Sequence, residues 1–269
     1  MNTVPDAELD RLVDILMDAE RTRRDLGRLT TDRPWLDATV AYRAQARQRE
    51  RRLDAGDQWV GTKLGLTSRA KQQRMGISSP LTGFLAASMA LPLGAPIPFA
   101  KLIHPRVEPE IVFVMKSRLV GPGVTAATAL AAVESVHAGL EVIDSRYTDF
   151  DFALADVIAD NASSARFAVS PTGVSPVGLD LQLEACVLRL NGEVVDTATG
   201  AAVQGNPFEA LALAANDLGA RGEAIEAGQL VLTGGLTDAI FIAPGDSVSV
   251  EFTSLGSLTI TVAASEGTT

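Results

Sequence analysis

Two glutamates separated by one residue stand at the start of an apolar segment. The stretch HPRVEPEIVFVM, residues 104–115, places Glu108 and Glu110 just before Ile111. In a β-strand alternate side chains share a face, so both carboxylates point the same way, with Cα atoms about 7 Å apart. Like charges this close repel unless a cation or a proton neutralises them. A divalent cation such as Mg²⁺ or Mn²⁺ prefers oxygen ligands, but E-x-E pairs are also common on solvated strand faces, so spacing alone leaves both interpretations open.

A third acidic residue stands in a similar setting. In HAGLEVIDSRY, residues 137–147, Glu141 opens the strand-like EVI after a helix predicted over residues 125–138. A face with three carboxylates and open coordination positions is therefore compatible with the sequence. Asp144 and Arg146 follow two residues apart, and we expect them to form a structural ion pair on one strand face.

Other reactive residue types are few. Cys186 is the one cysteine and lies in an apolar run, which predicts a small buried side chain, excludes an internal disulfide and is typical of a reducing compartment. His104 adjoins the glutamate strand, whereas His137 is expected to pack on the predicted helix. The sequence has neither a G-x-S-x-G elbow nor a histidine pair at metal-ligand spacing, so a serine hydrolase and a zinc site are poorly supported.

The elements that must position these residues follow from hydrophobic periodicity and turn residues. Helices are predicted at 6–26, 37–54, 125–138 and 207–218, the last with Asn206 as N-cap and Pro207 at the first position. Two strand-like runs around Asn191-Gly192 predict a hairpin over 183–198. The tail holds three more strand candidates, in QLVLT, DSVSVEF and SLTITV. We therefore predict an α+β fold with a helical N-terminal section, residues 1–58, and a mixed-sheet catalytic domain, residues 59–269.

Composition limits the class of protein. The chain has 269 residues, 46% of them hydrophobic, and a formal net charge of −10. Such a charge disfavours nucleic-acid binding, and the arginine-rich stretch at 47–52 is interpreted as a solvated helix face. The sequence shows no signal peptide and no run of about 20 apolar residues, which predicts a cytoplasmic protein that does not enter a membrane.

Four motifs, in order along the chain, resemble the fumarylacetoacetate hydrolase superfamily. They are GTKLGLTSRAKQQRMGISSPLTGFL at 61–85, HPRVEPEI at 104–111, LEVIDSRYTDFDF at 140–152 and IADNASSARF at 158–167. Within the superfamily they resemble the hydratase/decarboxylase branch of meta-cleavage aromatic degradation, and the likeness covers nearly the whole chain. The resemblance implies a mixed β-sheet or β-roll core and a homo-oligomer.

The resemblance also implies roles for particular residues. It places the metal ligands at Glu108, Glu110 and Glu141, with Mg²⁺ as the cofactor and Mn²⁺ as an alternative. It places a catalytic lysine at Lys63, which would bind an anionic oxygen or move a proton. It places the substrate-binding residues at Leu66, Thr67, Ser68, Asp160, Asn161, Ser163 and Thr233.

Two activities occur in that branch. One is decarboxylation of the 2-oxo dicarboxylate 2-oxo-3-hexenedioate (4-oxalocrotonate) to 2-hydroxypenta-2,4-dienoate and CO₂. The other is hydration of that dienoate. Leu81 and Thr82 stand where hydratases usually carry Asp-Phe, and this departure favours decarboxylation, because leucine cannot orient water. The hydratase, and a non-catalytic partner that associates with the hydratase, remain the alternatives.

Overall fold

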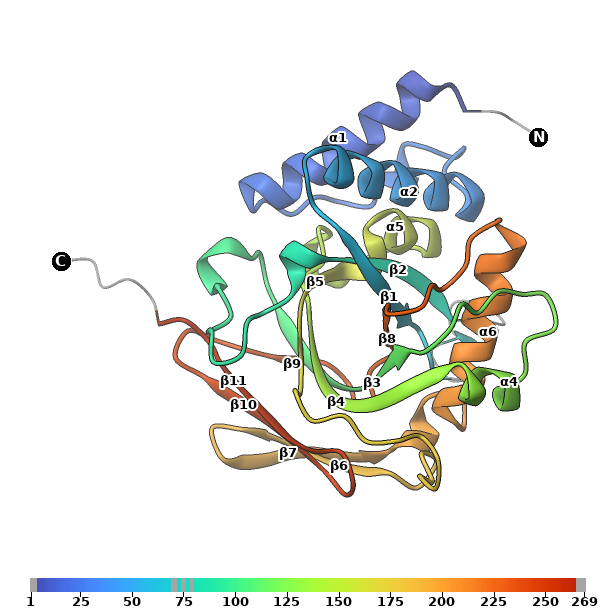
Figure 1. Ribbon diagram of the computed structural model, residues 1–269. Helices are drawn as coiled ribbons and strands as arrows, with labels where there is room; N and C mark the ends of the chain where they lie inside the picture. Colours follow the sequence, from blue (N-terminus) through green and yellow to red (C-terminus); the bar gives the residue numbers. More distant parts are fainter. Residues whose placement is uncertain (1–3, 69–71, 74–75, 78–79, 265–269) are drawn as a thin grey trace.

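Two β-sheets and a layer of helices make up the chain (Figure 1). The computed structural model describes residues 4–68, 72–73, 76–77 and 80–264, so part of the 61–85 motif lies outside the described residues. The larger sheet has the order β2-β1-β8-β3-β4-β5, with β9 also paired to β3, and the smaller sheet has the order β11-β10-β6-β7. The strands of the larger sheet are β1 Trp59–Gly65, β2 Leu81–Ala86, β3 Arg106–Met115, β4 Val133–Ile143, β5 Ser164–Val169, β8 Leu230–Leu232 and β9 Ile240–Phe241. Those of the smaller sheet are β6 Ala185–Leu190, β7 Glu193–Thr199, β10 Ser247–Phe252 and β11 Gly256–Thr261.

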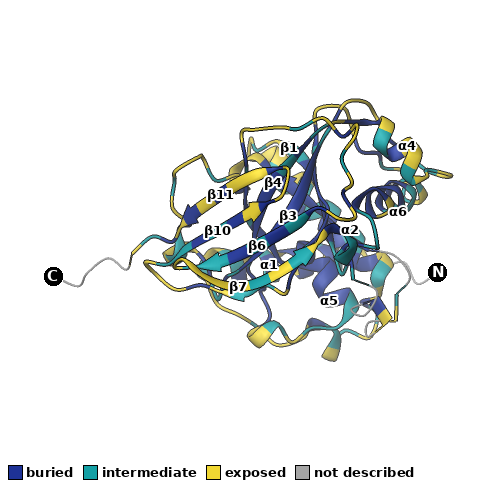
Figure 2. Ribbon diagram, turned by 90° about the horizontal axis from the view of Figure 1, so that it is seen from below, coloured by how far each residue is buried: buried dark blue, intermediate teal, exposed yellow. Residues whose placement is uncertain are grey.

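The larger sheet curls into a roll. Its end strand β5 meets the segment that follows β2, where the Leu91 N–H donates to the Phe167 carbonyl at 2.8 Å. Figure 1 looks along this roll and shows its strands arranged in a ring, with the smaller sheet packed beneath β4. The central strands β3 and β4 are almost wholly buried, whereas β7 exposes most of its residues (Figure 2). The α+β class and the mixed-sheet roll predicted from the sequence are confirmed.

Helices cover one side of the roll. They are α1 Asp6–Thr22, α2 Ala38–Asp54 and the short α5 Leu154–Ala159, while α4 Ala126–Ala131 and α6 Pro207–Ala220 pack together elsewhere on the sheet. Helix α1 turns Leu9, Leu12 and Leu16 toward the core, as its periodicity predicts. The predicted Asn206 N-cap is confirmed, since its side chain accepts a hydrogen bond from the Phe208 N–H at 2.9 Å. The sequence-based boundary at residue 58 stays a prediction.

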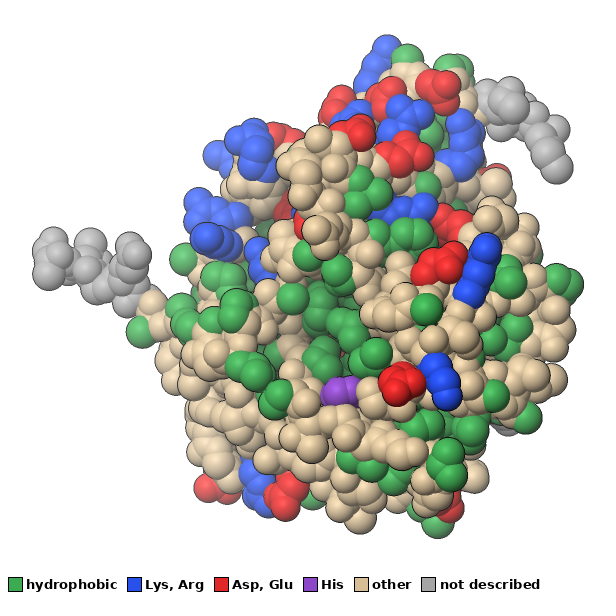
Figure 3. Space-filling view, in the orientation of Figure 1, with side chains coloured by type: hydrophobic (Ala, Val, Ile, Leu, Met, Phe, Trp, Pro, Cys, Tyr) green, Lys and Arg blue, Asp and Glu red, His purple; other side chains and the backbone are tan. Residues whose placement is uncertain are grey.

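The interpretation of residues 47–52 as a solvated face was wrong. Arg47 and Arg51 pair with Asp10 of α1, and Arg52 pairs with Glu20. Positive and negative side chains consequently alternate over α1 and α2 (Figure 3). These arginines join the two helices, because the acidic positions of α1 face them across the helix pair.

The helix predicted over 125–138 ends far earlier. Helix α4 stops at Ala131, and β4 begins at Val133, so His137 lies on a strand. Its ring accepts or donates a hydrogen bond with Ser135 Oγ at 2.8 Å. The small residues at 126–131 form the predicted helix, whereas residues 133–138 pair with β3 and are covered by the smaller sheet, so tertiary packing decided their conformation.

Pro109 lies inside β3 rather than at an edge or strand end. Residues 106–107 pair with β9, and residues 112–114 pair with β8, so the proline occupies the gap between these two partners. There the carbonyls of Pro109 and Ile111 accept hydrogen bonds from Leu236 N and Thr233 N, at 2.9 and 3.1 Å. A missing N–H is tolerated because the neighbouring chain departs from the ladder at that point.

Close contact between β1 and β8 gives a test of this architecture. A Cβ added at Gly61 would lie 2.2 Å from the Leu230 carbonyl oxygen. We expect Gly61→Ala to lower the free energy of unfolding by about 1–3 kcal/mol, measured by urea denaturation, because the strands must move apart. Gly27→Ala is the control, since no atom lies within 4 Å of its added Cβ. Unchanged stability of Gly61→Ala would contradict the close pairing of β1 and β8.

Candidate active site

Three carboxylates meet on one face of the larger sheet. Glu108 of β3 stands directly opposite Glu141 of β4, and Glu110 follows two residues along β3 on the same face. One oxygen from each carboxylate lies within 4.8 Å of the other two. Glu110 and Glu141 are 0% exposed and Glu108 is 9% exposed. The three side chains therefore face the interior of the roll, not solvent.

Neighbouring groups satisfy some of these oxygens. Lys63 of β1 crosses the roll and places Nζ 3.0 Å from Glu141 Oε2, and it also donates to the Ala162 carbonyl at 3.0 Å. Ser164 Oγ donates to Glu141 Oε1 at 2.9 Å, and the Gly234 N–H donates to Glu110 Oε2 at 2.6 Å. Glu110 Oε1 is buried, and no described residue hydrogen-bonds to it.

The charged side chains of the cluster shift one another's pKa values. Burial, reinforced by the adjacent carboxylates of Glu141 and Glu108, raises the pKa of Glu110 well above its usual value. Burial lowers the pKa of Lys63, but attraction by Glu141, Glu108 and Glu110 outweighs it and the lysine pKa is raised. Three carboxylates this close together repel one another, and a divalent cation between them would relieve that repulsion.

Glycines let the backbone approach the carboxylates. Gly234 has φ of +108°, a conformation that L side chains rarely adopt. A Cβ at Gly235 would lie 2.2 Å from Glu108 Oε2, and one at Gly234 would lie 2.2 Å from Thr67 Oγ1. Thr233 is buried beside them, with its hydroxyl donating to the Ile111 carbonyl at 2.8 Å. The segment 233–235 therefore forms a backbone wall against the cluster.

A cavity of about 650 Å³ opens onto this cluster. Lys63 and Glu108 reach its wall, while Glu110 and Glu141 lie behind them. Of the residues predicted to bind substrate, Leu66 and Ser163 line the cavity. The other lining residues are Gly65, Leu81, Arg106, Ile143, Phe150, Asp151, Phe152, Val157, Ala162, Asp238 and Ala239.

Several lining residues have strained backbone. Four of them have φ between 52° and 58° although none is glycine: Leu66, Phe150, Ala162 and Ser163. Each such residue costs about 1–3 kcal/mol, and strain of this kind concentrates at functional sites. The surrounding contacts must hold these turns in place, so the cavity wall is set by the fold around it.

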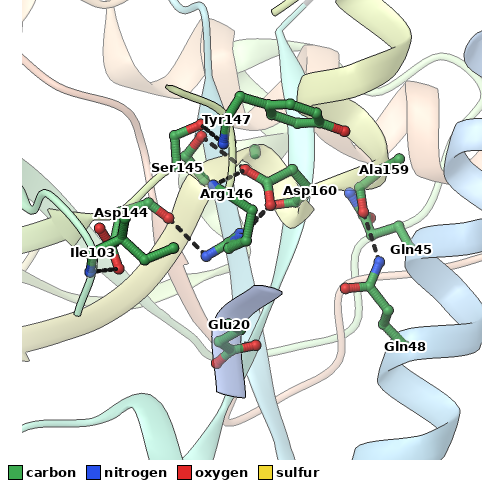
Figure 4. A network of polar contacts seen from close by, with 12 residues as sticks. Glu20, Gln45, Gln48, Ile103, Asp144, Ser145, Arg146, Tyr147, Ala159 and Asp160 are labelled. Atoms are coloured by element: carbon green, nitrogen blue, oxygen red, sulfur yellow. Dashed lines mark hydrogen bonds and ion pairs between the residues drawn. The ribbon is translucent and has the colours of Figure 1, made fainter. Parts of the chain in front are cut away.

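Asp160 and Asn161 hold one of those turns. Arg146 forms a buried ion pair with Asp160 (Figure 4). Ser163 Oγ also donates to that carboxylate, at 3.3 Å. The Asn161 side chain accepts a hydrogen bond from the Phe84 N–H at 2.8 Å and donates one to the Phe84 carbonyl at 3.0 Å. Neither residue lines the cavity, so both support the wall from behind.

The expected Asp144–Arg146 ion pair is wrong. Strand β4 ends at Ile143, so the strand alternation that would have placed both side chains on one face does not extend to them. The Asp144 carboxylate instead accepts hydrogen bonds from the backbone N–H groups of Ile103 and His104, at 2.9 and 2.8 Å. The contact of Arg146 with Asp144 is a hydrogen bond to its backbone carbonyl, at 2.7 Å, while its ion pair is with Asp160 (Figure 4).

Arg106 and Phe150 are wall residues that the sequence analysis missed. Arg106 precedes Glu108 by two positions on β3 and thus shares its face. The strand alternation that places Glu108 and Glu110 on one face also places Arg106 there, so the sequence contained the signal for this residue. Phe150 carried no comparable signal, because its position depends on a left-handed turn after β4.

Comparisons with known proteins agree with this geometry. Residues 47–263 match the family described as fumarylacetoacetate (FAA) hydrolase C-terminal. The chain belongs to the fumarylacetoacetate hydrolase family. It is 42% identical to a 4-oxalocrotonate decarboxylase of Pseudomonas putida, over 92% of this chain and 94% of that protein. It is 39% identical to a 2-keto-4-pentenoate hydratase of Burkholderia vietnamiensis, over 91% and 94%.

A solved relative has nearly the same fold. The structure of 4-oxalocrotonate decarboxylase from Pseudomonas putida G7, complexed with magnesium and adipate, superposes with a TM-score of 0.94 at 40% identity and covers 97% of this chain and 100% of that one. No helix in the described part of the present chain is long and apolar enough to cross a membrane.

Removal of the Asp160 charge tests the support behind the wall. We expect Asp160→Asn to lower the free energy of unfolding by about 3–5 kcal/mol, because it leaves the buried Arg146 guanidinium without its counter-ion. Asp151→Asn, which breaks an exposed pair with Arg28, should change it by at most about 1 kcal/mol. Equal effects in chemical denaturation would contradict a supporting role for the buried pair.

Proposed function

We propose that this protein is a divalent-metal-dependent decarboxylase. Its substrate would be 2-oxo-3-hexenedioate, and its products 2-hydroxypenta-2,4-dienoate and CO₂, in meta-cleavage degradation of aromatic compounds. The buried cluster of Glu108, Glu110 and Glu141 beside Lys63 carries the proposal, supported by the similarity to proteins named 4-oxalocrotonate decarboxylase.

The described residues fit a hard cation such as Mg²⁺, with Mn²⁺ as an alternative. The donor set is made of carboxylate oxygens only, which suits these ions. Glu110 Oε1 is buried without a hydrogen-bond partner among the described residues. Burial and the adjacent carboxylates raise the pKa of Glu110, as expected where a cation would relieve the repulsion between carboxylates. A cation there would act as a Lewis acid toward the α-oxo acid end of the substrate and stabilise the negative charge that develops on its C2 oxygen.

Lys63 is suited to bind an anionic oxygen. It is fully buried, and the surrounding carboxylates raise its pKa, so the ammonium stays charged. Loss of CO₂ from C6 leaves an electron pair that the C3=C4 double bond conjugates to the C2 oxygen. A fixed ammonium beside that oxygen stabilises it more strongly as negative charge develops there in the transition state. It can then donate a proton to the product.

The remaining predicted substrate contacts are part of the same proposal. Leu66 and Ser163 would touch the substrate directly, since they line the cavity. The other predicted substrate-binding residues would act from outside the cavity wall, by holding it in place. They are Thr67, Ser68, Asp160, Asn161 and Thr233. Apolar wall residues such as Leu81, Phe152 and Val157 would strip water from the carboxylate that leaves, which favours release of CO₂.

Hydration of 2-hydroxypenta-2,4-dienoate is the second candidate. Relatives named hydratase are 35–39% identical to this chain, and both reactions involve a dienolate. Leu81 distinguishes the candidates, because it lines the cavity and offers no group that orients water. Purified protein with Mg²⁺ should release CO₂ from 2-oxo-3-hexenedioate and fail to hydrate the dienoate. The reverse result would assign the hydratase activity.

We further propose that the protein forms a homo-oligomer and associates with the pathway hydratase. The dienol product is unstable, and direct capture by a hydratase would limit its loss. Co-purification of the two proteins in gel filtration would test the association, and separate elution at micromolar concentration would argue against it.

Replacement of one ligand separates metal binding from folding. We expect Glu110→Gln to abolish the Mg²⁺-dependent rise in melting temperature. In the absence of divalent cations the variant should be at least as stable as the parent, because one of three repelling carboxylates is neutral. The control is Glu251→Gln, on the exposed side of β10. A full Mg²⁺ response in Glu110→Gln would contradict the assigned site.

Lys63→Met tests the role of the ammonium. We expect kcat/KM for CO₂ release to fall about 10²- to 10⁴-fold. Mg²⁺ should bind at least as tightly as in the parent, because the cluster gains negative charge when the lysine is lost. Calorimetric titration with Mg²⁺ alongside initial rates separates the two effects. Parallel loss of metal binding and activity would indicate a structural role instead.

A further inference from the structure

A second cation stands on the cavity wall, apart from Lys63. Arg106 projects from β3 on the same face as Glu108, two residues away, and both line the cavity. Its guanidinium lies between two aromatic rings, 4.1 Å from the centre of Phe150 and 4.0 Å from that of Phe241. Nothing in the cluster of three glutamates requires this arginine.

The stacking leaves the hydrogen-bonding edge of the guanidinium available. The two rings contact the guanidinium through their π-systems and accept no conventional hydrogen bond from its five N–H donors. Arg106 Nε is buried, and none of the described residues accepts a hydrogen bond from it. Among the described residues Arg106 forms no ion pair, and Asp149 is the acidic group with an electrostatic influence on it. A planar fork of this kind matches a carboxylate, which accepts two parallel hydrogen bonds.

Other charges on the wall do not duplicate this function. Lys63 lies beside the glutamate cluster, where it contacts Glu141 and the Ala162 carbonyl, so its proposed partner is the oxygen at the α-oxo acid end of the substrate. Of the acidic wall residues, Asp151 pairs with Arg28 at the surface, and Asp238 lies beside β9. Within the described wall, Arg106 is thus the cation that remains for an anionic group entering from solvent.

The spacing fits a six-carbon diacid. Residues two apart in a strand have Cα atoms about 7 Å apart. The terminal carbons of an extended six-carbon chain lie about 6 Å apart, from five carbon–carbon bonds of ~1.5 Å. Because Arg106 and Glu108 line the same cavity, a six-carbon ligand whose α-oxo acid end reaches the glutamate cluster can present its other carboxylate to Arg106.

We propose that Arg106, stacked between Phe150 and Phe241, binds the distal carboxylate of the substrate and selects dicarboxylates over monocarboxylates. The inference rests on the proposed function and deepens it, since it concerns substrate choice at the same site. The carboxylate held by Arg106 loses its charge as CO₂ leaves, so this contact strengthens binding of the substrate more than of the transition state. Arg106 is accordingly a specificity residue, and its loss should raise KM without lowering kcat.

A pair of ligands that differ in one carboxylate gives the test. Calorimetry on the Mg²⁺-loaded protein would compare adipate, a six-carbon diacid, with hexanoate, its monoacid counterpart. We expect Arg106→Gln to weaken adipate binding about 10- to 100-fold, the usual range for a charge-assisted pair of hydrogen bonds. Hexanoate binding should change less than about 3-fold, and Arg106→Lys should restore part of the adipate affinity.

Controls separate this inference from loss of folding and from failure of the metal site. Arg118→Gln alters an exposed arginine and should leave both affinities as in the parent. Retained hexanoate and Mg²⁺ binding in Arg106→Gln shows that the variant is folded. If the parent takes up Mg²⁺ but binds adipate and hexanoate equally, or if Arg106→Gln weakens both acids alike, the assignment of Arg106 is overturned while the metal site stands. If the parent takes up no Mg²⁺, the proposed function fails first.

Discussion

Mutual repulsion among three buried carboxylates is the constraint on which the rest of the structure depends. One oxygen from each of Glu108, Glu110 and Glu141 lies within 4.8 Å of the other two, and all three side chains are buried. Lys63 offsets one of the three charges, and the Gly234 N–H and Ser164 hydroxyl satisfy individual oxygens. A cluster of buried carboxylates is costly unless a counter-ion compensates it, which is why we assign the cluster to a divalent cation.

The curled sheet supplies the precision that this cluster needs. Direct pairing of β3 with β4 fixes two carboxylates opposite each other, and closure of the roll brings Lys63 from β1 to the same point. Behind the cavity wall, the buried Arg146–Asp160 pair and the side-chain amide of Asn161 fix a strained turn, so the wall does not relax away from the cluster. Rigid strands thus carry the charged groups, while turns shape the cavity around them.

Local rules predicted the parts of the site that lie on regular strands. Alternation along HPRVEPE placed Glu108 and Glu110 on one face, and the turn residues Asn191-Gly192 and the cap at Asn206 were found correctly. The same rules failed where tertiary contacts decide. Residues 133–138 before Glu141 are strand rather than helix because they pair with β3 and the smaller sheet packs on them, and Arg146 turned to Asp160 because β4 had already ended. Lys63 could not be joined to Glu141 by any local pattern, since 78 positions separate them in the chain and only the closed roll brings them together; the family resemblance supplied that expectation.

Location of the cation is the most direct test of the central claim. Crystals of the protein grown with Mn²⁺ and measured at an X-ray energy where manganese scatters anomalously would show the ion unambiguously. The account predicts one strong peak per chain, about 2–2.3 Å from a carboxylate oxygen of each of Glu108, Glu110 and Glu141. A map with no peak between these three side chains, or with the ion bound at other residues, would contradict it.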